Sequence, residues 1–133
     1  MRAIARRTDG TLKHEIEFDN DQHRVVADEA EEDGGTDEGP NPQELLAASL
    51  ASCSAITMEM YAGRKGWDIG EVVVDVDYEP AQRGSPTKFV MKVKLPKELP
   101  EEQRNRLMQI VAKCPVHRTL EGEVMFDETL ELV

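Results

Sequence analysis

The chain contains two cysteines, Cys53 and Cys114, and the sequence places both on predicted helices. Cys53 lies in an uncharged stretch, where a free cysteine usually acts as a small apolar side chain. Cys114 falls on the apolar face of a second helix. If the two helices pack together, a reversible disulfide becomes possible, provided that the Cα atoms come within about 7 Å. In a reducing compartment such a pair is more often catalytic than structural.

Other patterns that carry chemistry are weak. Cys114-Pro-Val-His117 offers two zinc ligands, whereas a structural zinc site needs four. The phosphate-binding loops G-x-G-x-x-G and G-x-x-x-x-G-K-S/T do not occur, and neither does H-E-x-x-H. We therefore expect neither a metal nor a cofactor.

A thiol that reduces peroxides must ionise readily, because the thiolate is the nucleophile. The start of the predicted helix lies about three turns from Cys53, too far for its dipole to lower the thiol pKa much. A nearby cation would have to do so, and the candidates are Arg6, Arg7, Arg24 and Arg118. The apolar neighbours of Cys53 favour an organic hydroperoxide over hydrogen peroxide, although they fit plain core packing equally well.

Two helices must position these thiols. Asn41, Pro42 and Glu44 form the start of the first helix, as N-cap, first helical residue and capping-box partner. The run from Leu45 to Met58 carries no charge, which predicts a helix to about Arg64 that is buried on all sides. The uncharged run is shorter than the roughly 20 residues of a membrane span. A second helix is predicted over Pro100–Cys114, ended by Pro115.

Alternation of apolar and polar residues predicts strands at 2–7, 12–18, 23–27, 72–78, 89–95 and 124–132. The order βββαββαβ indicates an α+β fold with antiparallel sheets, in one domain that covers residues 1–133. The acidic stretch Asp28–Asn41 is expected to be an exposed loop. One small sheet cannot cover a helix that is apolar all round, so we expect a second subunit to complete the core.

The composition narrows the class of protein. The 133 residues carry 16 Lys+Arg and 27 Asp+Glu, a net charge of −11. This acidity argues against binding to nucleic acid or to anionic membranes. Two cysteines are too few for a disulfide scaffold, and the N-terminal residues contain no apolar signal stretch. We expect a cytoplasmic protein.

Taken together, the two cysteine segments resemble the OsmC/Ohr family of thiol-dependent hydroperoxide reductases. Gly39–Cys53 is similar to the block that opens the family's central helix, and Ala112–Leu120 is similar to its C-P-V block. The interval between the cysteines has the family's helix end, two strands and helix. Gly34-Gly35-Thr36-Asp37 is similar to the OsmC-like branch, which is less characterised than the dedicated organic-peroxide enzymes.

The resemblance implies an intertwined homodimer, with sheets wrapped around two central helices and active sites at the interface. Cys53 matches the peroxidatic position, where attack on an organic hydroperoxide gives a sulfenic acid. Cys114 matches the resolving position, which closes the disulfide. A dithiol of the lipoyl type would regenerate the pair, in an antioxidant role during oxidative stress.

The activating residues of the family match less well. The peroxidase branches carry a Glu ten residues before the reactive cysteine, where this chain has Gln43, with Glu44 one position on. The N-terminal Arg of the family has Arg7 as its nearest counterpart, and Arg24 is the alternative. The leading hypothesis is therefore a peroxidase. The alternatives are a small-ligand or redox-sensing protein without efficient peroxidase activity, and a structural dimer with inert thiols.

Overall fold

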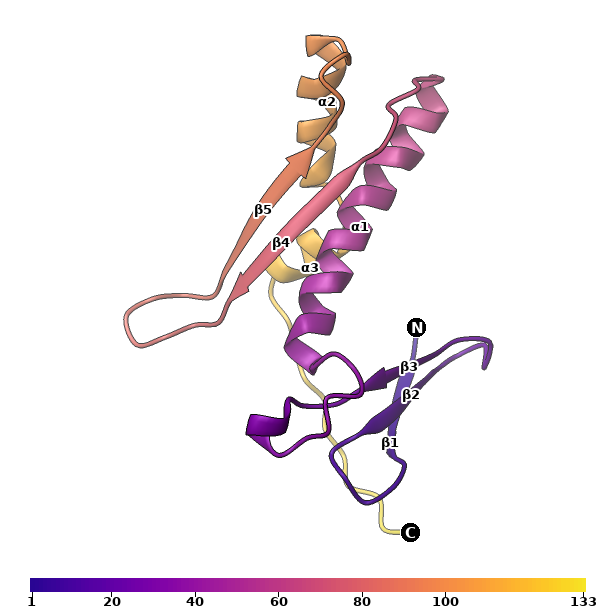
Figure 1. Ribbon diagram of the computed structural model, residues 1–133, viewed down its shortest axis with the longest axis vertical. Coiled ribbons are helices and arrows are strands. Elements are labelled where there is room, and N and C mark those ends of the chain that lie inside the picture. Colours follow the sequence, from indigo (N-terminus) through magenta and orange to yellow (C-terminus); the bar gives the residue numbers. More distant parts are fainter. The chain divides into compact units, whose positions relative to one another are not determined.

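A computed structural model, which describes residues 1–133, shows an α+β fold with two small antiparallel sheets (Figure 1). The chain divides into two compact units, Met1–Ala48 and Ser49–Val133. Helix α1, Pro42–Lys65, begins in the first unit and continues in the second. The expected fold class is confirmed.

The first unit contains the sheet β1-β2-β3, formed by Ala3–Arg7, His14–Phe18 and Arg24–Ala27. Neighbouring strands are antiparallel, and Ile16 of β2 pairs with Ala5 on one side and Val25 on the other. The three strands expected before the acidic stretch are thus confirmed, each within two residues of its expected start.

The acidic stretch after β3 is more ordered than the expected exposed loop. It contains a 3-10 turn, Glu31–Asp33, and Asp28 is buried with 2% of its surface exposed. The Asp28 carboxylate accepts four hydrogen bonds, from the backbone N–H groups of Glu29, Thr36 and Glu38 and from the Thr36 hydroxyl. These bonds hold the pKa of Asp28 at about 2, the Thr36 hydroxyl contributing most. The expectation was wrong for Asp28, because an acidic side chain can be buried where several donors surround it.

Gly35 follows this turn where no side chain would fit. A Cβ at this position would lie 2.0 Å from the carbonyl oxygen of Glu29, and Gly34 before it has φ +94°. The backbone therefore requires glycine at both positions, which explains the Gly34-Gly35 pair.

The start of α1 has the expected capping box. The Glu44 N–H donates to Oδ1 of Asn41 at 2.8 Å, and the Asn41 N–H donates back to Oε1 of Glu44 at 3.2 Å. Burial differs from the expectation, because only Leu50, Ser54, Met58 and Ala62 are buried. These residues recur every four positions and form one stripe, while Ile56 and Met60 remain more than half exposed. α1 has the length and mean hydropathy of a membrane span, a property it shares with core helices of water-soluble proteins.

The second unit contains the hairpin of β4, Val73–Glu79, and β5, Lys88–Lys94. Alternate residues of β4 are half-buried, and the Tyr78 ring stacks on its cross-strand neighbour Phe89, with centroids 4.9 Å apart. On the exposed face of the hairpin, Asp75 of β4 lies directly opposite Lys92 of β5. The hairpin expected from the alternation is confirmed.

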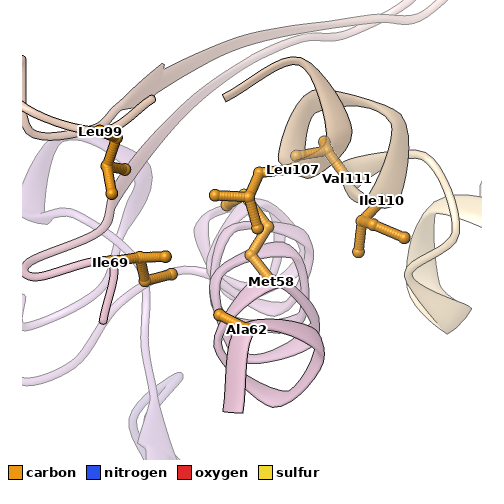
Figure 2. Close-up of a cluster of buried hydrophobic side chains, with 7 residues drawn as sticks. All are labelled: Met58, Ala62, Ile69, Leu99, Leu107, Ile110 and Val111. Atoms are coloured by element: carbon orange, nitrogen blue, oxygen red, sulfur yellow. The ribbon is translucent and has the colours of Figure 1, made fainter. Parts of the chain in front are cut away.

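The core of the second unit lies between α1, the hairpin and α2, Glu101–Val111 (Figure 2). Met58 and Ala62 of α1 meet Leu107, Ile110 and Val111 of α2, which are the apolar positions expected for that helix. Ile69 and Leu99 belong to the same cluster and come from the segments that flank the hairpin. The core therefore fixes α1 against α2 near the second cysteine.

The end of the chain corrects two expectations. α2 ends at Val111 instead of Cys114, and a third helix, α3, spans Pro115–Glu121. Pro115 starts a helix here because proline at the first helical position loses no hydrogen bond. The strand expected at 124–132 is absent: the segment has no regular secondary structure and is exposed, with Met125 and Phe126 each more than four-fifths exposed. A strand needs a neighbour to pair with, and this chain provides none for it.

Candidate functional site

The two cysteines are brought together in the second unit as free thiols. Cys53 lies in the middle of α1 and is partly exposed, whereas Cys114 has no exposed surface. Cys114 is the N-cap residue of α3, and its Sγ accepts a hydrogen bond from the His117 N–H at 3.4 Å. The turn between α2 and α3 thus aims Cys114 inward.

The pKa values of the two thiols shift in opposite directions. Burial raises the pKa of Cys53, and its hydrogen bond with Cys114 raises it further. Burial also acts to raise the pKa of Cys114, but hydrogen bonds from Cys53, the His117 N–H and Ser54 outweigh it and lower this pKa. Of the two thiols, Cys114 therefore has the lower pKa.

Two residues next to the thiols, Ser54 and Thr57, were not singled out from the sequence, and His117 was considered only as a zinc ligand. Ser54 is fully buried, and its hydroxyl lowers the pKa of Cys114. Thr57, one turn after Cys53, lowers the pKa of Cys53 by a hydrogen bond. The His117 N–H holds Cys114 from the first turn of α3. Proline directly after Cys114 was the available signal for this last contact, since it is typical of a helix start.

Arg7 and Arg24, two of the arginines expected near Cys53, lie in the first unit, and each is engaged there. Arg7 donates to the carbonyl oxygens of Thr11 and Gly10 in the β1–β2 turn. Arg24 lies 2.5 Å from Glu15, 3.1 Å from Glu17 and 2.9 Å from Asp21. These contacts account for both guanidinium groups within their own sheet.

Arg6 and Arg118, the other two candidate cations, fall in different units. Nε of Arg6 lies 3.5 Å from Glu17 in the first unit. Arg118 lies on α3, which is also the helix that Cys114 caps.

The residues expected at the start of α1 have different surroundings. Glu44 is occupied by the capping box with Asn41, and Gln43 is exposed. Neither belongs to the unit that contains the two thiols. Their roles, like those of the arginines, stay predictions.

Fold and site together define an α+β protein that holds a buried thiol against a partly exposed one. The family model for OsmC-like proteins matches residues 35–129, which include both cysteines. The chain therefore belongs to the OsmC/Ohr family. No curated protein sequence matches it.

Solved structures with the same fold agree with this membership. An OsmC-like protein from Mycoplasma pneumoniae is 19% identical, with a TM-score of 0.73, over 91% of this chain and 86% of that one. The organic hydroperoxide resistance protein OhrB of Bacillus subtilis is 23% identical, with a TM-score of 0.60, over 91% and 90%. An organic hydroperoxide resistance protein from Legionella pneumophila is 20% identical, with a TM-score of 0.59, over 92% and 90%. At these identities the likeness shows the fold.

Proposed function

We propose that this protein reduces organic hydroperoxides, with Cys53 as the attacking thiol and Cys114 as the resolving thiol. The observation that carries the proposal is the contact between two free cysteines of different exposure. A substrate from solution can reach the partly exposed Cys53, while the fully buried Cys114 is reached only through its neighbour. The organic hydroperoxide resistance proteins with the same fold support the substrate class.

The reaction has two steps in the protein. The Cys53 sulfur attacks the terminal oxygen of the hydroperoxide, so an S–O bond forms, the O–O bond breaks and the alcohol leaves with a proton. Cys53 is then a sulfenic acid. The Cys114 thiolate attacks this sulfur, so the S–S bond forms and the S–O bond breaks. The departing hydroxide takes a proton from solvent and becomes water. An external dithiol of the lipoyl type then reduces the disulfide, which returns both thiols.

The proton arrangement gives Cys114 a role in the first step as well. Cys53 carries the hydrogen that it shares with Cys114, and only its thiolate is a good nucleophile. Because the pKa of Cys114 is the lower of the two, the Cys114 thiolate is placed to accept this proton as Cys53 attacks. The same thiol is then deprotonated again once the alcohol has taken the proton.

Thiol trapping tests the proposal directly. Cumene hydroperoxide is added to Cys114→Ser and Cys53→Ser proteins in the presence of dimedone, which labels sulfenic acid. We expect dimedone on Cys53 in Cys114→Ser and an unlabelled Cys114 in Cys53→Ser. Label on Cys114 would reverse the two roles. The absence of any label, with intact circular dichroism, would exclude the peroxidase.

A second function is favoured by one observation, the raised pKa of Cys53. With Gln43 in place of the family's Glu, the chain would oxidise slowly and act as a redox sensor or ligand-binding protein. Stopped-flow kinetics separate the two functions, because a sensor forms the disulfide but does not turn over when dithiol is supplied. Repeated turnover with dihydrolipoamide and slow turnover with glutathione support the peroxidase.

We also propose that the protein forms a homodimer in the cytoplasm. Ile56 and Met60 on α1 and Met108 on α2 are each more than half exposed, and the unpaired segment 123–133 adds Met125 and Phe126. Exposed apolar side chains on two helices and on one unpaired segment indicate a surface that an apolar surface of a second subunit would cover. Light scattering measures the mass, and deletion of residues 123–133 should shift it from a dimer to a monomer. An unchanged mass after deletion contradicts the role of this segment.

A further inference from the structure

We propose that a groove beside the C-terminal end of α1 binds a small organic carboxylate, with Arg106 and Lys65 holding the charged end. The groove has a volume of about 390 Å³, and its walls come from α1, α2 and the segment after α1. It is lined by Tyr61, Lys65, Trp67, Glu102, Asn105, Arg106 and Gln109. Tyr61 follows Cys53 by eight residues, which places the groove about 12 Å along the helix from the thiol.

Arg106 forms no ion pair with its nearest acidic neighbour on the helix. Glu102 precedes it by four residues, which is the spacing and order that favours an ion pair. Instead, Nε of Arg106 donates to the Tyr61 hydroxyl at 2.9 Å, and Nη1 donates to Oε1 of Gln109 at 2.9 Å. The guanidinium is thus held over the groove, and its Nη2 donors take no part in these two bonds.

The cations around the groove have no carboxylate partner. Lys65, Arg106 and Lys113 are absent from the ion pairs of the structure, although the chain has far more acidic than basic residues. Their combined effect is felt at Tyr61, whose pKa is lowered by the hydrogen bond from Arg106 and by the charges of Arg106, Lys65 and Lys113. A positive potential at this point, within a chain of net charge −11, favours a negatively charged ligand.

The aromatic residues add an apolar wall. The Tyr61 and Trp67 rings meet edge to face, with centroids 5.6 Å apart. The Arg106 guanidinium carbon lies 5.5 Å and the Lys65 ammonium 5.7 Å from the Tyr61 ring centroid. Both cations therefore lie over the Tyr61 ring. A ligand with a carboxylate at one end and a flat apolar body at the other matches both parts.

The Arg106 side chain selects a carboxylate by geometry. Guanidinium donors form a planar fork that matches two carboxylate oxygens, and Lys65 adds a point charge. The Tyr61 hydroxyl accepts from Arg106, so its own hydrogen is available to the ligand. The Glu102 carboxylate, which also lines the groove, would repel a second negative charge on the ligand. The groove therefore favours a monocarboxylate over a dicarboxylate.

Benzoate is a suitable probe, and benzamide is its neutral counterpart of the same shape. Trp67 is the only tryptophan, so its indole N–H gives a single signal in a ¹H–¹⁵N spectrum that reports on the groove. We expect benzoate to shift this signal with saturation and a dissociation constant on the order of 1 mM. Benzamide and chloride at matched ionic strength should leave it in place.

Variants assign the binding to the groove. Arg106→Gln should weaken benzoate binding at least about tenfold, and Lys65→Gln should weaken it severalfold. Arg104→Gln is the matched control, since Arg104 lies on the same helix but does not line the groove. Glu102→Gln should strengthen binding. Cys53→Ser should bind benzoate as the native protein does, because the site is independent of the thiol chemistry.

Three results would overturn this proposal. The first is an equal response to benzoate and benzamide, which would mean apolar contact alone. The second is an equal loss in Arg104→Gln and Arg106→Gln, which would mean general charge attraction. The third is a Trp67 signal that does not move, which would mean that the groove is closed in the assembled protein. Lys65→Gln keeps the test valid if Arg106→Gln fails to fold.

Discussion

The two units of the chain are stabilised internally by different kinds of interaction. In the first, a buried carboxylate and a network of charged side chains organise the acidic segment and the sheet β1-β2-β3. In the second, apolar side chains of α1 and α2 form the core beside two thiols. The arginines differ accordingly. Arg24 of the first unit forms ion pairs with three carboxylates, whereas Arg106 of the second unit donates a hydrogen bond to the Tyr61 hydroxyl. A cationic side chain is therefore available to bind a ligand or activate a thiol only where the local fold provides no carboxylate to pair with it.

The apolar core of the second unit should give the largest effect. Leu107 has no exposed surface, so Leu107→Ala should lower the free energy of unfolding by about 2–5 kcal/mol. Met108, the next residue, is 52% exposed and provides the matched control, Met108→Ala. Urea unfolding followed by circular dichroism measures both. Equal losses in the two variants would contradict the assignment of the core.

In the first unit, substitution of Asp28 should have the largest effect on stability. Its pKa of about 2 in the folded protein lies below the value of about 3.9 in the unfolded chain. The hydrogen bonds to the carboxylate therefore stabilise the fold fully above about pH 3.9, and this stabilisation is lost as the pH falls towards 2. Asp28→Asn should lower the urea midpoint at neutral pH, and the gap to the native protein should close in acid. Asp33→Asn, an exposed acid of the same segment, should change little at either pH. A gap that stays constant with pH would contradict the argument.

The capping box should have a smaller effect. Asn41→Ala removes the side-chain bond to the Glu44 N–H and should cost about 1 kcal/mol. Gln43→Ala, at an exposed position of the same turn, is the control. Thermal unfolding resolves the difference, and a stable Asn41→Ala protein would mean that the rest of the fold fixes the helix start.

Arg24 should have the smallest effect on chemistry. If its carboxylate contacts keep it in the sheet, Arg24→Gln should oxidise Cys53 with cumene hydroperoxide at close to the native rate. Stopped-flow fluorescence or competition with a thiol dye gives this rate. A fall of tenfold or more would assign Arg24 to activation of the thiol and break the comparison between the two units.

Much of the fold could be predicted from the sequence, because alternation and caps are local signals. The strands of both sheets and the start of α1 follow from residues that lie next to each other. The remaining features depend on partners distant in the chain. Asp28 was assigned to an open loop because its donors come from further along the segment, and α3 was missed because Pro115 was interpreted only as a stop.

The candidate site divides in the same way. The two cysteines could be paired from their positions on helices that pack together. Ser54 could not be singled out, because its burial beside Cys114 depends on how α1 meets the turn after α2. The segment 124–132 has the pattern of a strand but forms none, because the pattern alone does not supply a neighbouring strand to pair with.

The central claim is that Cys53 and Cys114 work as one redox pair. Peptide mass mapping after one equivalent of cumene hydroperoxide per chain tests it most directly. The account predicts loss of both free thiols and one disulfide-linked peptide pair that joins Cys53 to Cys114 within a chain. Two thiols that stay reduced, or disulfides that join cysteines of different chains, would contradict it.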